Sequence, residues 1–463
     1  MSMLWTFLLL LALLNTYLCM PISVSSATVT LHPLGGPGTR VAQDKFNIAG
    51  VWNRTYGETE PQQIHLAWVS NGVACRVQFA TRENTDGAIF RYWRAGFEEQ
   101  AQVIQTERGR AFEDGGEAHH TVYLHSITSD RLEPATLYHY QVASYLIPQR
   151  FEWSPIYRFH SPSTEDAFSF VATADMGTAN AVSLANLQRA AQSHAYDFIA
   201  YAGDQAYDMA DFNGTKGDEY MNFVQDIYAT LPTMTAVGNH EHAYNFSHYK
   251  HRFSILPHAE SGFPDPTMYS FDYKALHLVA ISSEVFFENG SPDQMHAALH
   301  WLEADLQAAR QAQRPWIVVM AHRPLYCTPA DPEDEDCGWK AQVMRHHLEE
   351  LFLRYRVDIY LCGHRHNYER TFPVAHDARI ATSYRNAPSF FQLGVGNAGN
   401  FQGPDTFLKD PRLIRPWSAL RYPSYGFSTI KVTPHYLDIE HFESHPHDGS
   451  LGKRIDFVRV RKH

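Results

Sequence analysis

The chain has 463 residues, of which 44% are hydrophobic and 19% are charged, and its formal net charge is -12. This composition is typical of globular proteins and excludes a chain that is disordered throughout. The negative charge argues against sequence-independent binding of nucleic acid or of anionic lipid, because both partners require an excess of Lys and Arg. A prior of about one domain per 150 residues suggests roughly three domains.

Residues 1–26 have the pattern of a secretory signal peptide. They contain no charged side chain, and Leu4 to Leu14 forms an apolar block shorter than the roughly 18 residues that a membrane span needs. Val24 and Ser26 occupy the -3 and -1 positions of a cleavage site before Ala27. We therefore predict a secreted protein without a membrane span. A signal anchor or a buried helix is the alternative, and lysosomal delivery stays open.

Two further features fit a secretory route. Cys327 and Cys337 bracket an acidic loop and are the best disulfide candidate in an oxidising compartment, with a pair of free thiols as the alternative. Sequons of the type Asn-x-Ser/Thr beside a signal peptide predict a glycoprotein. The four sequons are Asn53, Asn213, Asn245 and Asn289.

Residues 27–160 read as an all-β domain. They are rich in Thr, Val and Tyr and contain short alternating runs such as Gln63 to Val69, separated by turn residues. Leu132 to Tyr140 is similar to the tyrosine corner of a fibronectin III-like sandwich, in which a Tyr hydroxyl bonds back to the chain. Trp68 is expected to fill the core, and residues 161–166 read as a linker.

From residue 167 to residue 463, strands and helices alternate, which predicts an α/β domain with a largely buried sheet. The predicted helices are Val182 to Ala195, Gln294 to Arg310 and Lys340 to Arg354. An irregular insertion is expected before the strand at Met234. The predicted strands are Phe168 to Thr173, Phe198 to Ala202, Met234 to Val237, Tyr269 to Tyr273, Leu276 to Ser282, Trp316 to Ala321 and Val357 to Leu361. Closing strands are expected at Tyr425 to Val432 and at Ile455 to Val460.

Polar side chains follow the strands of this second domain where the strands end. In open α/β sheets the ligand crevice lies at the carboxyl ends of the strands. His364 and His366 are two residues apart in an extended segment, so both can face one site. A glycine precedes Asp204, Asn239 and His364 and is expected to let the backbone turn tightly. The side chains expected to meet are Asp175, Asp204, Tyr207, Asn239, His322, His364 and His366.

These donors comprise two carboxylates, one amide, one phenol and three imidazoles. Carboxylate, phenolate and imidazole together suit a hard trivalent ion such as Fe³⁺. Carboxylate, amide and two imidazoles suit Zn²⁺, Mn²⁺ or Fe²⁺, and one carboxylate can bridge both cations. Two metals roughly 3.5–4 Å apart form the clamp that in-line phosphoryl transfer uses.

The arrangement resembles that of the purple acid phosphatases, within the dinuclear metallophosphoesterases. The family pattern is DxG, GDxxY, GNH(E/D), VxxH and GHxH, in that order. The resemblance covers nearly the whole mature chain. It implies a metallophosphoesterase domain with two sheets flanked by helices, in which residues from about 408 to 463 supply the closing strands. The blocks here are Asp175 to Gly177, Gly203 to Tyr207, Gly238 to Glu241, Val319 to His322 and Gly363 to His366.

The resemblance also implies a role for each ligand. Asp175, Tyr207 and His366 would bind the ferric ion. Asn239, His322 and His364 would bind a divalent ion, which is Zn, Mn or Fe. Asp204 would bridge the two ions. A phenolate bound to Fe³⁺ produces the charge-transfer colour for which the family is named, so Tyr207 separates this interpretation from an ordinary metallophosphoesterase.

His240, beside the ligand Asn239, is the candidate catalytic residue. It is placed to bind phosphate oxygens or to protonate the leaving alkoxide, and Glu241 is a candidate to orient it. The alternative is that both side chains are only solvated at a strand end. The plant enzymes carry extra His residues after the VxxH block, whereas residues 323–338 contain no His and five acidic residues. The leaving-group acid therefore stays open. Arg323 is either a phosphate ligand or part of a surface ion pair.

These features predict a secreted acid phosphatase that hydrolyses phosphate monoesters by in-line attack of a metal-bound hydroxide. A ferric ion lowers the pKa of bound water further than a divalent ion does, so hydroxide would persist in acid. One alternative is a phosphodiesterase or nucleotide pyrophosphatase on the same scaffold. Another is a secreted recognition protein with an inactive metal domain, which a missing ligand would indicate, and none of the seven is missing. The physiological substrate, the divalent metal and the oligomeric state stay open.

Overall fold

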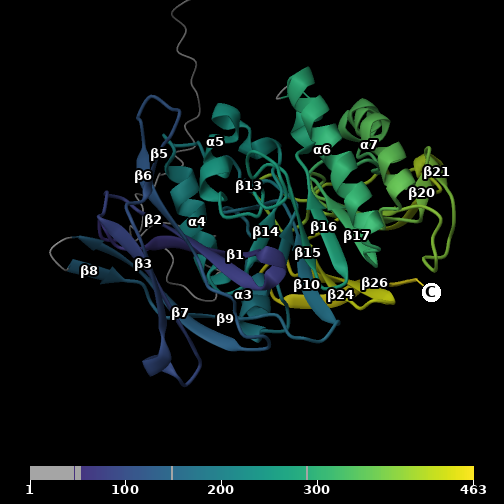
Figure 1. Cartoon of the computed structure of the whole chain (residues 1–463). Coiled ribbons are helices and arrows are strands. Elements are labelled where there is room, and N and C mark those ends of the chain that lie inside the picture. The colour runs from purple at the N-terminus through teal and green to yellow at the C-terminus, as the bar shows by residue number, and fades with distance from the viewer. Residues whose placement is uncertain (1–45, 47–53, 147–149, 288–289, 463) are drawn as a thin grey trace, which may run out of the picture. The chain divides into compact units, whose positions relative to one another are not determined.

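The computed structural model describes residue 46 and residues 54–146, 150–287 and 290–462. The predicted signal peptide and the sequons at Asn53 and Asn289 lie outside these residues. Within them, none of the helices combines the length and apolar character that crossing a bilayer requires. The described residues form an N-terminal β-sandwich followed by an α/β body (Figure 1).

The N-terminal sandwich consists of antiparallel strands in two sheets. The strands are β1 (Gln62–Val69), β2 (Ala74–Thr81), β3 (Gly87–Arg94), β4 (Gln102–Thr106), β5 (Arg110–Glu113), β6 (Thr121–Thr128), β7 (Leu137–Leu146), β8 (Arg150–Trp153) and β9 (Tyr157–His160). One sheet has the order β1-β2-β6-β5, and the other has the order β4-β3-β7-β8, with β9 paired to β7. The Glu133 backbone N–H donates to the Tyr138 hydroxyl at 3.0 Å, which confirms the predicted tyrosine corner. Trp68 is fully buried, as predicted.

The edge strand β1 is covered by helix α4 (Thr215–Tyr228) of the α/β body. The backbone N–H of Gln63 donates to Asn222 Oδ1 at 3.1 Å, and that of Ile64 donates to Gln225 Oε1 at 2.9 Å. These side chains occupy donors that an exposed edge would offer to another chain. The segment expected to be an irregular insertion is therefore partly helical. Its buried polar residues, which serve the sandwich, interrupt the apolar period that would have indicated a helix.

The first sheet of the α/β body has six strands in the order β14-β12-β10-β24-β25-β26. Its strands are β10 (Phe168–Thr173), β12 (Ile199–Tyr201), β14 (Thr233–Thr235), β24 (Gly426–Val432), β25 (Tyr436–Ser444) and β26 (Leu451–Arg461). Strands β10, β12 and β14 are parallel, and the three closing strands are antiparallel. Two closing strands match the prediction, and β25 was not predicted. Helix α3 (Leu184–Ser193) lies inside the predicted helix at Val182 to Ala195.

The second sheet has seven strands in the order β15-β16-β17-β18-β22-β19-β23. They are β15 (Tyr269–Tyr273), β16 (Leu276–Ala280), β17 (Trp316–Met320), β18 (Ile359–Cys362), β19 (Tyr368–Thr371), β22 (Phe391–Val395) and β23 (Ser418–Tyr422). Strands β16, β17, β18 and β22 run parallel. Two short strand pairs complete the body: β11 (Met176–Gly177) with β13 (Gln205–Ala206), and β20 (Val374–Ala375) with β21 (Ala378–Arg379).

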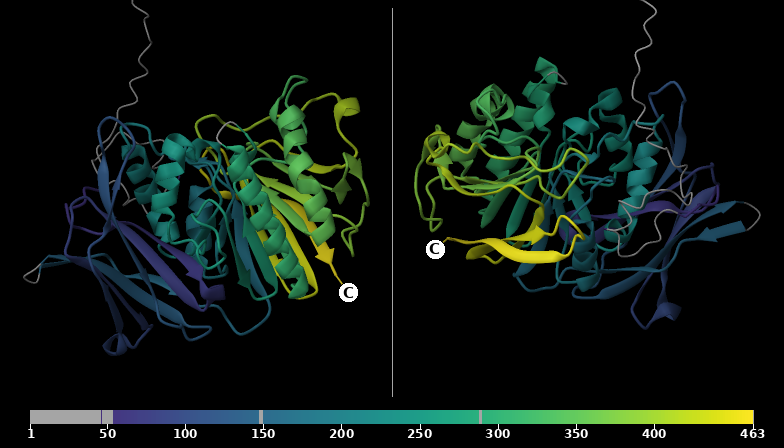
Figure 2. Two further views of the ribbon diagram at one scale, coloured as in Figure 1. Left: turned by 45° about the horizontal axis from the view of Figure 1, so that its top comes forward. Right: turned by 180° about the vertical axis from the view of Figure 1, so that it is seen from behind.

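The seven-stranded sheet is buried on both faces because alternate side chains enter different cores. Ile317 and Val319 pack into one core with α6 (Pro292–Gln311) and α7 (Ala341–Tyr355), which cover the outer face of this sheet (Figures 1 and 2). Val318 and Met320 enter the other core, together with residues of the six-stranded sheet. Helix α5 (Ala243–Arg252) precedes this part of the chain. The predicted fold class of an N-terminal sandwich with two helix-flanked sheets is confirmed.

A cluster of charged side chains connects β15, β16 and α6, and none of its residues belongs to the five metal-site motifs. His277 Nδ1 lies 2.9 Å from Asp272 Oδ1, and its Nε2 lies 2.8 Å from Asp305 Oδ2. Burial alone would lower the pKa of His277, but the hydrogen bonds and charges of these carboxylates raise it to about 9. Arg314 also contacts Asp272, and Ser270 donates to Asp305 at 2.6 Å. His277 is therefore expected to be cationic in the folded protein at neutral pH.

Replacing His277 with Gln should destabilise the protein in a pH-dependent manner. Since the folded-state pKa lies above the unfolded value of about 6.5, the stabilisation is full below pH 6.5 and is lost as the pH rises through 9. His277→Gln is expected to lower the free energy of unfolding by about 3 kcal/mol at pH 6 and by far less at pH 10. Urea unfolding at both pH values measures the difference, with the exposed His119→Gln as control. An equal loss at both pH values would contradict the assignment.

Candidate metal centre

Six of the seven predicted ligand residues follow strands of the two large sheets, and Tyr207 follows β13 of a short two-stranded sheet. Asp175 and Asp204 follow β10 and β12, and Asn239 begins a short turn, Asn239–Glu241, after β14. In the second sheet, His322 follows β17, and His364 and His366 lie between β18 and β19. The two carboxyl edges thus supply donors to one place, as the strand-end pattern predicted.

Three of the side chains form a first group around the Tyr207 hydroxyl. This hydroxyl lies 3.2 Å from Asp175 Oδ1 and 2.9 Å from His366 Nε2, and His366 Nε2 is 3.5 Å from Asp175 Oδ1. Burial raises the pKa of Tyr207, and the charges of Asp175 and Asp204 raise it further. A phenolate at this position therefore requires a cation among the three side chains.

The other four side chains form a second group around His322 Nε2. This nitrogen lies 3.0 Å from Asp204 Oδ2, 3.1 Å from Asn239 Oδ1 and 3.2 Å from His364 Nδ1. Ligand atoms of Asp204, His322 and His364 all lie within 4.8 Å of one another. The backbone N–H of His364 donates to Asp175 Oδ2 at 2.9 Å, which links the two groups.

The hydrogen bonds of His322 show that a cation fits the second group. Its Nδ1 is 2.9 Å from the carbonyl oxygen of Ala202, which can only accept, so the proton lies on Nδ1. Its Nε2 faces a carboxylate, an amide oxygen and a second imidazole. Burial alone would lower the pKa of His322, but the charges of Asp204 and Asp175 raise it to about 10. The group therefore favours a positive charge at this point, which a bound metal ion would supply in place of the ring proton.

The backbone around these ligands is strained. Four of the seven residues have positive φ: Asp175 (64°), Asp204 (56°), Tyr207 (53°) and His364 (70°). Such conformations cost roughly 1–3 kcal/mol each and cluster at functional sites. Gly203 has φ +90°, and a Cβ there would lie 2.7 Å from His322 Nδ1. Gly363 has no positive φ, but a Cβ there would collide with Asp175 Oδ2, so close approach explains this glycine better than the expected tight turn.

A loop after β22 that the sequence did not indicate fixes the first group. Asn400 Nδ2 donates to the Tyr207 hydroxyl at 2.7 Å. The carbonyl oxygen of Gly403 lies 3.2 Å from His366 Nδ1, and Asp405 accepts the His366 backbone N–H at 2.9 Å. The proton of His366 therefore lies on Nδ1, and its Nε2 lone pair faces Tyr207. Partners of this kind orient metal-binding side chains.

His240 lies beside the second group, and its ring is held by a residue that the sequence did not indicate. His240 Nδ1 lies 2.9 Å from Asp208 Oδ1, and its Nε2 is 4.0 Å from Asp204 Oδ2. Burial alone would lower the pKa of His240, but Asp208 and Asp204 raise it to about 9. His240 is therefore available as a proton donor near the donor set.

The expected role of Glu241 in orienting His240 needs correction. Glu241 is buried, and its carboxylate accepts the backbone N–H groups of Asp204, Gln205 and Gly238 at 3.0, 2.6 and 2.7 Å. It therefore fixes the two loops that carry Asp204 and Asn239, while Asp208 orients the His240 ring. Adjacent residues of a turn point their side chains in different directions, so adjacency of positions 240 and 241 did not predict contact.

The acidic segment after His322 lies against the second group. The disulfide between Cys327 and Cys337 is present, as predicted. Arg323 is not part of a surface ion pair: its Nε and Nη2 bind the buried Glu284 carboxylate at 2.9 and 3.1 Å. Arg323 Nη1 lies 3.2 Å from His364 Nε2. The guanidinium is thus already occupied by protein partners, which disfavours a role as a primary phosphate ligand.

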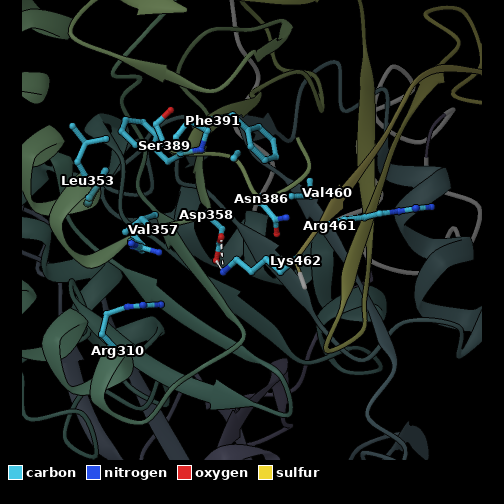
Figure 3. Close-up of a pocket in the computed structure, with 15 residues that line it drawn as sticks. Arg310, Leu353, Val357, Asp358, Asn386, Ser389, Phe391, Val460, Arg461 and Lys462 are labelled. Carbon is cyan, nitrogen blue, oxygen red and sulfur yellow. Dashed lines mark hydrogen bonds and ion pairs between the residues drawn. The ribbon is translucent and has the colours of Figure 1, made fainter. Parts of the chain in front are cut away.

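A separate cavity of about 590 Å³ lies at the amino ends of strands in the seven-stranded sheet, opposite the carboxyl ends that carry the donors (Figure 3). Asp358, just before β18, and Ser389, just before β22, line it, so it opens at the amino ends of these strands. Lys462 and Asp358 form an ion pair inside it at 2.7 Å. No predicted site residue lines this cavity, so it is distinct from the candidate metal centre.

Comparison with known families places this site in a class of enzymes. Residues 168–368 match the calcineurin-like phosphoesterases. Residues 61–161 match the purple acid phosphatase N-terminal domain, and residues 390–453 match the iron/zinc purple acid phosphatase-like protein C-terminal family. Fold and site thus define a metallophosphoesterase.

Individual proteins narrow the class. The acid phosphatase type 7 of Danio rerio is 32% identical over 430 residues, which cover 87% of this chain and 92% of that protein. The Homo sapiens protein of the same name is 32% identical over 420 residues, covering 86% and 90%. A purple acid phosphatase from yellow lupin (Lupinus luteus) seeds shares the fold, with a TM-score of 0.72 at 19% identity over 87% of this chain and 75% of that one. The chain belongs to the purple acid phosphatase family, which confirms the resemblance seen in the sequence.

Proposed function

We propose that this chain is an acid phosphatase that hydrolyses monoesters of phosphoric acid with small leaving groups at an Fe(III)–M(II) centre. The family makes it a phosphatase with an iron-containing dimetal scaffold. The observation that carries the proposal is that a carboxylate, an amide oxygen and an imidazole converge on His322 Nε2, next to a separate group built around a tyrosine hydroxyl. One group suits a divalent ion, and the other suits a ferric ion.

The proposed ligand set follows these two groups. Asp175, Tyr207 and His366 would bind iron, and Asn239, His322 and His364 would bind the divalent ion, for which Zn, Mn and Fe are candidates. Asp204 would bridge them, because one oxygen faces His322 and its charge also acts on Tyr207. When bound, the two cations supply acidified water and neutralise charge on the phosphoryl group.

The side chains of the protein have separate tasks in this proposal. Asn400 donates to the Tyr207 oxygen and so favours its ionised form. Glu241 fixes the loops of Asp204 and Asn239 through three backbone hydrogen bonds. His240, oriented by Asp208, would bind a phosphate oxygen or give its proton to the leaving group.

The remaining proposals concern the cellular route of the protein and the division of the chain into domains. Residues 1–26 would direct the chain into the secretory pathway and then be cleaved, and the protein would end outside the cell or in a lysosome. The mature chain would then consist of the sandwich, residues 27–160, and the catalytic domain, residues 167–463. Asn213 and Asn245 are exposed, so both sequons are accessible for glycosylation. The Cys327–Cys337 disulfide fits an oxidising compartment.

Hydrolysis of a matched monoester and diester tests the function. We expect 4-nitrophenyl phosphate to be hydrolysed at least about 10²-fold faster in kcat/KM than bis(4-nitrophenyl) phosphate, with the highest rates below pH 7. The pH–rate profile of purified, metal-replete protein measures both quantities. Faster hydrolysis of the diester would favour the phosphodiesterase alternative. No turnover of either ester, with both metals present, would overturn the enzyme assignment.

A further inference from the structure

The disulfide-closed acidic loop, residues 327–337, contacts one of the proposed metal ligands directly. Asp336 precedes Cys337, and its Oδ1 lies 3.2 Å from His364 Nε2. The side chain of Asp336 is 25% exposed, so the contact is partly shielded from water. The loop therefore places a carboxylate behind the imidazole ring, on the side away from the proposed divalent ion.

Asp336 is held in this position by several cations. Lys340 Nζ donates to its Oδ1 at 2.9 Å, and Arg323 Nη1 lies 3.4 Å from the same oxygen. Arg365 Nη1 lies 3.8 Å from the other carboxylate oxygen. The disulfide adds a covalent constraint one residue away. Several contacts thus fix the position of this carboxylate, whereas a side chain in an exposed loop would be free to move.

The two ring nitrogens of His364 face different partners. Its Nδ1 faces His322 Nε2 at 3.2 Å inside the donor group, and its Nε2 faces Asp336. Arg323 Nη1 also points a donor at Nε2, at 3.2 Å. Once Nδ1 binds a divalent ion, the ring proton must lie on Nε2, where Asp336 Oδ1 is an acceptor at 3.2 Å.

Among the three imidazoles of the centre, His364 alone has a carboxylate as the partner of its outer nitrogen. His322 and His366 bind neutral carbonyl oxygens, those of Ala202 and Gly403. An anionic partner makes an imidazole a stronger metal ligand than a neutral partner does, and loss of such a partner typically costs 10–100-fold in metal affinity or activity. The anionic partner therefore strengthens a ligand of the divalent site and no imidazole ligand of the ferric site.

We propose that Asp336 is a positioning residue for His364, and that the Cys327–Cys337 disulfide keeps it there, so that this loop sets the affinity of the divalent site. The inference rests on the proposed function, because it assumes His364 to be a ligand. It assigns a task to the segment in which the plant enzymes carry additional His residues. Asp336 acts through the ligand and does not touch substrate.

Zinc binding to purified protein that retains its iron tests the role of Asp336. Asp336→Ala is expected to weaken Zn²⁺ binding 10–100-fold in a competition titration with a chelator, while the visible absorption of the ferric site stays unchanged. Asp336→Asn keeps an acceptor oxygen but not the charge, so its zinc affinity should lie between those of the wild type and of Asp336→Ala. The matched control is Glu335→Gln in the same loop, whose side chain is 65% exposed and pairs only loosely with Lys340 at 3.7 Å. Wild-type zinc affinity in Asp336→Ala, or equal loss of iron and zinc with a lower Tm, would overturn the proposal.

A double-mutant cycle tests the role of the disulfide. Cys327→Ser/Cys337→Ser should also weaken zinc binding, and adding Asp336→Ala should cause little further loss, because both changes remove the same contact. If the combined variant instead loses zinc affinity by the product of the two separate losses, the disulfide does not act through Asp336. If the proposed function itself is wrong, wild-type protein will show neither the visible absorption nor zinc binding, which distinguishes the two failures.

Discussion

Asp204→Asn is expected to reduce kcat/KM for a phosphate monoester by about 10⁴-fold or more, equivalent to roughly 5 kcal/mol of transition-state stabilisation. The substitution is nearly isosteric, and the amide oxygen can still accept the His240 backbone N–H, which binds Asp204 Oδ1 at 2.9 Å. It removes the negative charge and the second oxygen that faces His322. We therefore expect the fold to remain and the centre to lose at least one of its two metals.

Steady-state kinetics combined with elemental analysis of the same preparation measures this effect. Asp438→Asn is a suitable control, because Asp438 pairs with Arg459 on the closing strands and has no contact with the donor groups. Retention of both metals together with more than about a tenth of the wild-type activity would contradict a bridging role for Asp204.

Replacing His240 with Asn is expected to lower kcat by 10²–10⁴-fold without loss of metal, as is typical for removal of a general acid. His240 lies next to the donor set, yet its ring nitrogens face Asp208 and, at 4.0 Å, Asp204, so the ring is a neighbour of the centre and not a member of either group. Asp208→Asn should give a smaller loss, because it disturbs only the orientation of the ring.

The leaving group distinguishes the two tasks proposed for His240. If His240 protonates the leaving alkoxide, His240→Asn will harm hydrolysis of an alkyl phosphate far more than that of 4-nitrophenyl phosphate, whose leaving group needs little protonation. If His240 binds a phosphate oxygen, the substitution will lower the hydrolysis rates of both esters by the same factor. Unchanged rates for both would remove His240 from the catalytic machinery, and loss of metal would make it a structural support of the centre.

Local signals in the sequence predicted much of the fold. Alternating apolar residues such as Gln63 to Val69 indicated the all-β class of the sandwich, and the segment at Leu132 to Tyr140 indicated a corner that the Glu133–Tyr138 hydrogen bond confirms. Buried strands followed by polar residues indicated the edge where the donors meet. Strands β19, β22 and β23 were not predicted, because their short runs between Tyr368 and Tyr422 mix apolar with polar and charged residues that are satisfied only by tertiary contacts.

The surroundings of the candidate site were much harder to predict than its donors. The backbone carbonyls of Ala202 and Gly403, which orient two imidazoles, carry no signal in the side-chain sequence. Asn400 and Asp208 act through contacts that form only when distant segments meet. Glu241 was recognised as important by position, but its partners are backbone N–H groups and not the neighbouring ring.

Elemental analysis of native protein together with its visible absorption spectrum examines the proposed centre most directly. We expect about one iron and one divalent ion per chain, and a broad visible band that disappears in Tyr207→Phe while iron is retained. The Tyr207 hydroxyl, only 2.9 Å from His366 Nε2 and 3.2 Å from Asp175 Oδ1, is the group that would give rise to this band. Protein that contains no iron, or a band that persists unchanged in Tyr207→Phe, would contradict the assignment of the centre.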